Sequence, residues 1–145
     1  MEYAVRVLGI RDIIVCGHSH CGAMHGLLHP ETLGSLPLVS NWLRHAEATR
    51  RIVHEKRPEE TGEDRVLDAA KENVLVQLEN LRTHPCVVEG LALGQLRLHG
   101  WLYEIETGGV LAHHPVQKQF LPVTGAAASS AERRSTARAG SVSTG

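Results

Sequence analysis

The sequence predicts an α/β fold, and three of its segments carry that prediction. Residues 12–16 include three consecutive β-branched side chains, which is typical of a buried strand in a parallel sheet. Residues 63–83 place apolar side chains at helical spacing. Residues 95–106 alternate well enough for another strand, and after two glycines residues 110–112 are expected to pair back as a hairpin. The chain of 145 residues is long enough for one such domain, with helices flanking the sheet.

The N-terminal third contains the first predicted strand between two short helices. Residues 2–8 are expected to end a helix, because apolar side chains recur at helical spacing and Gly9 follows as a stop signal. The strand at residues 12–16 comes next, and Gly17 is predicted to end it. Residues 22–28 are predicted to form a second short helix, before a loop that Pro30 opens.

The middle third is predicted to be helical. Residues 37–56 fit a helix with one buried face, and Pro37 suits its first turn. The apolar positions of that face are Leu38, Val39, Trp42, Leu43, Ala46, Ile52 and Val53. After a turn at residues 58–62, the helix at 63–83 has the clearest pattern. Its stripe consists of Val66, Leu67, Ala70, Val74, Leu75, Leu78 and Leu81, and Pro85 ends it.

The last third begins with a short helix and ends in a tail of different composition. Residues 86–93 are predicted to form a helix that Gly94 closes, ahead of the strand at 95–106. The apolar positions in that strand are Leu96, Leu98, Trp101, Tyr103 and Ile105. From residue 122 the side chains are small, polar and weakly basic, which predicts disorder. We therefore expect a folded domain over residues 1–121 and a disordered tail over 122–145.

Composition argues against several kinds of partner. The formal net charge of −1 disfavours nucleic acid, because phosphate binding needs a basic excess. No apolar run reaches the roughly 18 residues of a membrane-spanning helix, and the first residues show no signal-peptide pattern.

The three cysteines are an odd number and two stand beside histidines. This favours a reduced, cytoplasmic chain with metal or thiolate chemistry over a disulfide framework.

The stretch VCGHSHCGAM, residues 15–24, is the candidate functional site. It follows the carboxyl end of a predicted strand, where open α/β sheets bind ligands. A turn flanked by glycines can aim His18 and Cys21 at one point, and an imidazole with a thiolate suits Zn²⁺. His-x-x-Cys alone is a weak signal, because a polar strand-to-helix turn with internally bonded side chains shows the same pattern. Cys16 is expected to be a small buried residue.

A local zinc-handling module is the least favoured interpretation of this stretch. It would use His18, His20, Cys21 and His25 together. Four donors within eight residues cannot easily surround one ion on a strand, a turn and a helix. His20 and His25 are instead expected to be exposed.

Two longer stretches resemble the β-class carbonic anhydrases of bacteria, cyanobacteria and plants. They are EYAVRVLGIRDIIVCGHSHCGAM at residues 2–24 and ENVLVQLENLRTHPCVVEGLALGQLRLHGWLYEIETGGV at residues 72–110, and the resemblance extends over about residues 2–113. Its most specific runs are GHSHCGA and HGWLYEIETG. The resemblance implies a zinc-dependent lyase that reversibly hydrates carbon dioxide to bicarbonate. It also implies a homodimer or larger homo-oligomer.

The resemblance assigns roles to five residues of this sequence. His18 matches the zinc-binding histidine of the family, and Cys21 matches its second zinc-binding cysteine. Tyr3 matches a tyrosine that lines the active site across the dimer interface in plant-like members, although it also fits a half-buried helix position. Gly17 and Gly22 match glycines of the turn beside the metal. Trp101 and Tyr103 are expected only to pack the last strand.

The first zinc cysteine of the family lies in a Cys-x-Asp-x-Arg motif, and no cysteine of this sequence stands in such a motif. The resemblance therefore implies a sequence that is N-terminally incomplete. It would lack the first two strands, the first zinc cysteine and the neighbouring aspartate–arginine pair, and the strand at 12–16 would keep an unpaired edge. Zinc needs three protein ligands and one open position for this chemistry. The chain as given is thus expected to hold zinc weakly and to be inactive alone.

Two interpretations of function remain open. The chain is either an incomplete β-carbonic anhydrase or a non-catalytic remnant with a binding or regulatory role. Asp12 stands at the wrong end of its strand to replace the missing carboxylate. The resemblance to cyanobacterial members also leaves a carboxysome open as an alternative to the cytoplasm.

Overall fold

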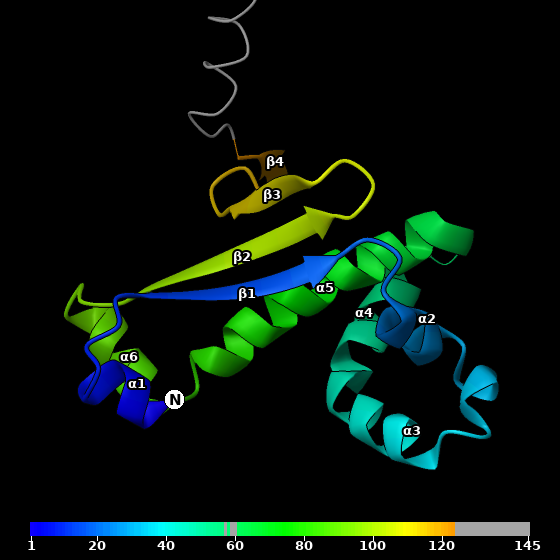
Figure 1. Cartoon of the computed structure of the whole chain (residues 1–145), viewed down its shortest axis with the longest axis horizontal. Coiled ribbons are helices and arrows are strands. Elements are labelled where there is room, and N and C mark those ends of the chain that lie inside the picture. The colour runs from blue at the N-terminus through cyan, green and yellow to red at the C-terminus, as the bar shows by residue number, and fades with distance from the viewer. Residues whose placement is uncertain (57, 59–60, 124–145) are drawn as a thin grey trace, which may run out of the picture.

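The computed structural model describes residues 1–56, 58 and 61–123, and its sheet has four strands in the order β1-β2-β3-β4 (Figure 1). The strands are β1 (Asp12–His18), β2 (Arg97–Glu104), β3 (Gly109–His114) and β4 (Gln119–Pro122). β1 pairs with β2 in parallel, whereas β2–β3 and β3–β4 are antiparallel. The predicted α/β fold with a C-terminal hairpin is confirmed. Within the described part of the chain β1 is an edge strand, as expected.

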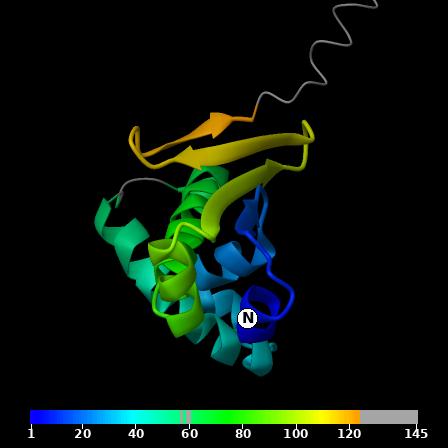
Figure 2. The same ribbon diagram turned by 90° about the vertical axis from the view of Figure 1, so that its left-hand side faces the viewer.

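Six α-helices and two 3₁₀ turns accompany this sheet in the described residues. They are α1 (Glu2–Arg6), α2 (Gly22–Leu28), η1 (Pro30–Leu33), α3 (Pro37–Leu43), η2 (Arg44–Ala46), α4 (Glu47–Lys56), α5 (Gly62–Leu81) and α6 (Pro85–Ala92). Figure 2 shows the helices gathered on one side of the sheet. Among the described residues, no helix is long and apolar enough to cross a membrane.

The single helix predicted over residues 37–56 is wrong, because the 3₁₀ turn η2 separates α3 from α4. A 3₁₀ turn has three residues per turn instead of 3.6, so the apolar positions on either side of it no longer share one face. Leu43, Ala46 and Val53 are buried as predicted. Leu38 and Trp42 are 84% and 73% exposed.

The core lies between α5 and the sheet. Val66, Ala70, Val74 and Leu78 form the buried stripe of α5, as predicted. Leu102 of β2 is fully buried opposite them. The apolar face of this strand was predicted at Trp101, Tyr103 and Ile105. Leu102 lies on the opposite face of β2, so its burial was not predicted. Tyr103 and Ile105 are exposed.

Two glycines let the strands approach α5 closely. A Cβ atom on Gly17 would lie 3.1 Å from Val74 Cγ2 and 3.2 Å from the carbonyl oxygen of Ala70. A Cβ atom on Gly100 would lie 2.9 Å from Val74 Cγ1. Gly17 is therefore a packing residue inside β1, and the prediction that it ends the strand is wrong. β1 continues to His18.

The C-terminal end of the described chain adds a strand that we did not predict. β4 is short, pairs with β3 and ends at Pro122, so the first residue assigned to the tail lies in a strand. Val123 of the predicted tail is also described, with its N–H bonded to the Val110 carbonyl, and the tail from residue 124 lies outside the described residues.

Candidate functional site

The turn between β1 and α2 brings the predicted site residues to the carboxyl ends of the two parallel strands. His18 is the last residue of β1 and is the register partner of Tyr103 in β2. Ser19 and His20 form the turn, and Cys21 is the N-cap residue of α2. This end of a parallel sheet is where α/β proteins bind ligands. The residues predicted to follow a strand therefore lie at the carboxyl end of β1.

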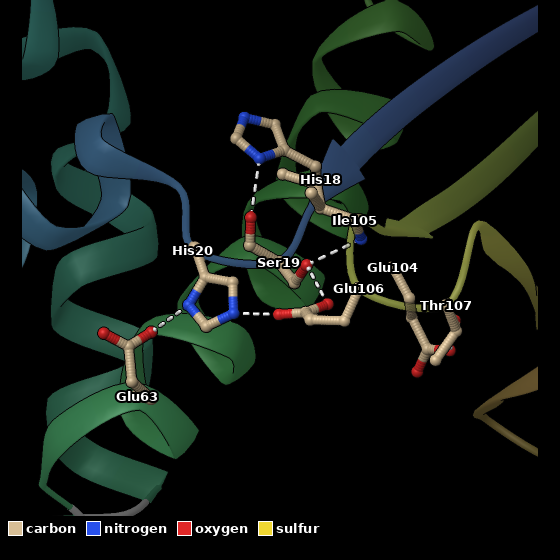
Figure 3. Close-up of polar contacts among 8 residues, drawn as sticks. All are labelled: His18, Ser19, His20, Glu63, Glu104, Ile105, Glu106 and Thr107. Carbon is tan, nitrogen blue, oxygen red and sulfur yellow. Dashed lines mark hydrogen bonds and ion pairs between the residues drawn. The ribbon is translucent and has the colours of Figure 1, made fainter.

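His18 is exposed, and its ring is held by one hydrogen bond. Nδ1 lies 2.7 Å from the carbonyl oxygen of Ser19 (Figure 3). A carbonyl oxygen only accepts, so Nδ1 donates and Nε2 keeps its lone pair in the neutral ring. Histidines that bind metals commonly have this arrangement, with the second nitrogen bonded to a carbonyl or a carboxylate.

Ser19 is buried and is hydrogen-bonded to β2 and to the segment that follows it. Its backbone N–H donates to the carbonyl oxygen of Tyr103 at 3.0 Å. Its hydroxyl donates to Glu106 Oε2 at 2.9 Å and accepts from the backbone N–H of Ile105 at 3.0 Å (Figure 3). A backbone N–H bond at Glu106 and the Ser19 hydroxyl lower the pKa of the Glu106 carboxyl, and the charge of His20 adds to this. Glu106 is thus an ionised acceptor at neutral pH.

His20 links the same turn to two carboxylates. Its Nδ1 lies 2.8 Å from Oε2 of Glu63, at the start of α5, and its Nε2 contacts Oε1 of Glu106 (Figure 3). Only the protonated ring can donate to both. The backbone of His20 has φ +52°, a left-handed conformation that costs a residue other than glycine roughly 1 kcal/mol or more. His20 is exposed as predicted, but no pattern in the sequence indicates its two carboxylate partners.

The three cysteines have different environments. Cys21 is half-buried and packs against the main core cluster. Cys86 is buried in α6. Cys16 is exposed, which contradicts its predicted burial. The reason is the parity of β1, because Gly17 faces α5 and Cys16 therefore points to the opposite face.

The structure does not bring Tyr3 and His18 together within one chain. Tyr3 is 66% exposed on α1, which lies at the opposite end of β1 from α2 (Figure 1). Asp12 also lies at that far end, where its carboxylate bonds Arg97 and His99. Asp12 is therefore too far along the strand to serve as an orienting carboxylate beside His18, as expected.

The candidate donors fit zinc in kind but not in number. An imidazole nitrogen and a thiolate are ordinary zinc ligands, whereas a working site needs three protein ligands. In residues 1–56, 58 and 61–123, no group of three or more His, Cys, Asp or Glu side chains is placed to hold a metal ion. His18 and Cys21 therefore form at most part of a metal site within the described chain.

Comparison with known proteins identifies the family. A family model described as carbonic anhydrase matches residues 1–110. The carbonic anhydrase of Synechocystis sp. is 52% identical over 122 residues, which are 83% of this chain and 44% of that protein. The carbonic anhydrase of Pseudomonas aeruginosa is 48% identical, over 83% of this chain and 54% of that protein.

Solved structures of carbonic anhydrases also resemble this chain. The β-carbonic anhydrase CcaA superposes with a TM-score of 0.82 at 52% identity, covering 85% of this chain and 60% of that one. A tetrameric β-carbonic anhydrase of Sordaria macrospora gives a TM-score of 0.69 at 30% identity, covering 77% of this chain and 56% of that one. The chain belongs to the carbonic anhydrase family, and its fold is that of the β-class enzymes. It spans about half the length of the curated relatives it matches.

Proposed function

We propose that this chain supplies part of the zinc site of a β-carbonic anhydrase and serves the reversible hydration of carbon dioxide to bicarbonate and a proton. The main support for the proposal is the orientation of the His18 ring, in a chain that belongs to this family. Its Nδ1 is bonded to the Ser19 carbonyl at 2.7 Å, which leaves Nε2 available at the ligand-binding end of the sheet. Cys21 follows three residues later as the second donor.

Bound zinc would supply an activated water molecule near neutral pH. The task of this chain is to hold the metal with His18 and Cys21. The third donor has to come from outside the described set, and the Cys-x-Asp-x-Arg motif of the family is the candidate source.

Tyr3 and the oligomeric state belong to the same proposal. The Sordaria macrospora neighbour is tetrameric, and we propose that this protein is also a homo-oligomer. Tyr3 is exposed on α1 and far from His18 of its own chain. In an oligomer, Tyr3 would line the site of a second copy and not its own. We place the activity in the cytoplasm, with a carboxysome as the alternative compartment.

A non-catalytic role is the second candidate. It is favoured by one observation, that the described residues supply fewer than three clustered donors. Such a protein would keep the fold and a weak metal site but perform no hydration.

A stopped-flow pH-indicator assay separates the two candidates. It compares the 145-residue chain, the chain extended at its N-terminus by a segment carrying Cys-x-Asp-x-Arg, and the extended chain with Cys21→Ser. We expect hydration above the uncatalysed rate only in the second. A folded, zinc-loaded but inactive extended chain would support the non-catalytic role. Rapid hydration by the unextended chain, abolished by His18→Ala, would show that these residues already form a complete site.

A further inference from the structure

We propose that Ser19 and Glu106 are positioning residues that fix the ring of His18 for metal binding; this inference rests on the proposed function. Neither residue is a candidate ligand. They act through the turn that separates His18 from Cys21, and Glu106 reaches that turn from the segment between β2 and β3, 87 residues away from Ser19 in the sequence.

The Ser19 carbonyl is the link to His18, because it accepts the hydrogen bond from His18 Nδ1. The rest of Ser19 is held on three sides. Its N–H bonds the Tyr103 carbonyl, and its hydroxyl bonds both the Ile105 N–H and the Glu106 carboxylate. A Ser19 residue that cannot rotate keeps its carbonyl aimed at Nδ1, and this selects the tautomer with a free Nε2.

Glu106 also holds the next residue of the turn. One carboxylate oxygen accepts from Ser19 and the other contacts His20 Nε2 (Figure 3). His20 has the left-handed backbone that the turn requires, and Glu63 of α5 holds the other side of its ring. The Glu106 carboxylate thus restrains both residues between the two candidate ligands. Without it, Ser19 would keep only its bonds to the backbone of β2 and the segment after it.

The same segment offers a matched control. Glu104 lies two residues before Glu106, and its carboxylate bonds the Thr107 hydroxyl at 3.0 Å. In Figure 3 the Glu104 side chain points away from Ser19 and His20. Removing the Glu104 carboxylate therefore perturbs the segment without removing a contact to the metal-binding turn.

The test uses Co²⁺ as the probe, because a cobalt–thiolate bond gives an absorption band, and loss of that band in Cys21→Ser assigns it to Cys21. The reduced 145-residue chain is titrated with Co²⁺ beside Glu106→Ala, Ser19→Ala, Ser19→Thr and Glu104→Ala. We expect Glu106→Ala and Ser19→Ala to weaken Co²⁺ binding by roughly tenfold or more, the usual effect of losing an outer partner of a metal ligand. Ser19→Thr restores the hydroxyl and is expected to recover affinity, and Glu104→Ala to bind as the parent does.

A second measurement needs no metal and separates positioning from a general loss of stability. Nitrogen NMR of the His18 ring, recorded where its spectrum shows the neutral form, reports which nitrogen carries the proton. We expect Nδ1–H in the parent and in Glu104→Ala, and a mixture of tautomers in Glu106→Ala. Circular dichroism confirms that each variant is folded. A lower melting temperature with an unchanged tautomer and unchanged Co²⁺ affinity would overturn the inference.

The outcomes also separate this inference from the proposed function. If His18→Ala and Cys21→Ser abolish the cobalt–thiolate band while Glu106→Ala binds within twofold of the parent, the inference is wrong and the proposed site stands. If the band survives both ligand substitutions, the proposed site is wrong and the inference is overturned with it. If the 145-residue chain gives no band, the His18 tautomer decides, and a tautomer in Glu106→Ala equal to that of the parent overturns the inference.

Discussion

Asp12 and Arg97 are register partners in the parallel pair of β1 and β2, and their side chains also form a bidentate ion pair. Arg97 Nε and Nη2 lie 2.8 Å and 2.9 Å from the two carboxylate oxygens of Asp12. His99 Nε2 contacts the same carboxylate at 2.7 Å. These hydrogen bonds, that of Arg97 first, hold the pKa of Asp12 well below its usual range. The cluster fixes the start of the parallel pair, at the end of the sheet away from His18.

Replacing Arg97 should weaken the fold slightly and leave the candidate site intact. A carboxylate whose pKa is lowered by folding adds stability above its unfolded pKa, and that stability is lost as the pH falls through the folded pKa. We expect Arg97→Ala to lower the melting temperature at neutral pH by a small amount, because the pair is exposed, and by less at high salt. Thermal melts at two salt concentrations check this. A change in Co²⁺ affinity would contradict the separation of the two ends.

The two glycines that flank the candidate turn should respond differently to a methyl group. Gly17→Ala places a Cβ atom 3.1 Å from Val74 Cγ2 and beside the Ala70 carbonyl, whereas a Cβ atom on Gly22 meets nothing within 4 Å. We expect Gly17→Ala to destabilise the protein by about 1–3 kcal/mol through overpacking. Gly22→Ala should be neutral or slightly stabilising, because alanine favours helices. Urea denaturation measures both, and equal effects would refute the packing role of Gly17.

Truncating Leu102 should cost far more than truncating Leu38, although both are leucines. Leu102 is fully buried against α5, and Leu38 is 84% exposed on α3. We expect Leu102→Ala to lower the free energy of unfolding by about 2–5 kcal/mol. Leu38→Ala should stay within about 0.5 kcal/mol of the parent. A large effect at Leu38, dependent on protein concentration, would indicate that α3 is buried between chains.

Acidification should destabilise the protein partly through His113. Burial, with a smaller effect of His114, lowers the pKa of His113 below 6.5. The unfolded chain therefore takes up this proton more readily, so stability is expected to fall as the pH drops below about 6.5. His113→Asn should flatten that loss, and the exposed His45→Asn should not. Melting temperatures between about pH 7.5 and 5.5 test the difference.

Zinc content gives the most direct test of the incomplete donor set. We expect the 145-residue chain to retain less than one zinc per chain after dialysis against a mild chelator, because only His18 and Cys21 match family ligands. Cys21→Ser should remove that zinc, and Cys86→Ser, in α6, should not. Stoichiometric, retained zinc would mean that a third donor exists in this chain, with Cys16 and His20 the first to examine.

The parts of the fold that the sequence predicted well are those with local signals. The bounds of α2 agree with the prediction, and the stripe of α5 is buried at Val66, Ala70, Val74 and Leu78. The β2–β3 hairpin follows from its glycines. β4 was missed because four residues that end in a proline carry too little pattern.

Burial and contacts depend on tertiary packing and were predicted less well. Trp42 is exposed because a 3₁₀ turn changes the helical phase, and Cys16 is exposed because Gly17 determines the parity of β1. The candidate ligands were located by their position after a strand and by resemblance. The bond between Ser19 and Glu106 joins residues 87 apart, and no spacing in the sequence signals it.

The parallel pairing of β1 with β2 also bears on the order in which the molecule assembles. The Asp12–Arg97 pair closes a segment of 85 residues, whereas the β2–β3 hairpin turns within a few residues. Closing the longer segment costs more chain entropy, so the hairpin and α5 are expected to form first and β1 to dock late. On the ribosome, β1 leaves the exit tunnel long before its partner strand exists. During that interval Ile13, Ile14 and Val15 lack their β2 partner, and exposed apolar strand residues of this kind promote aggregation.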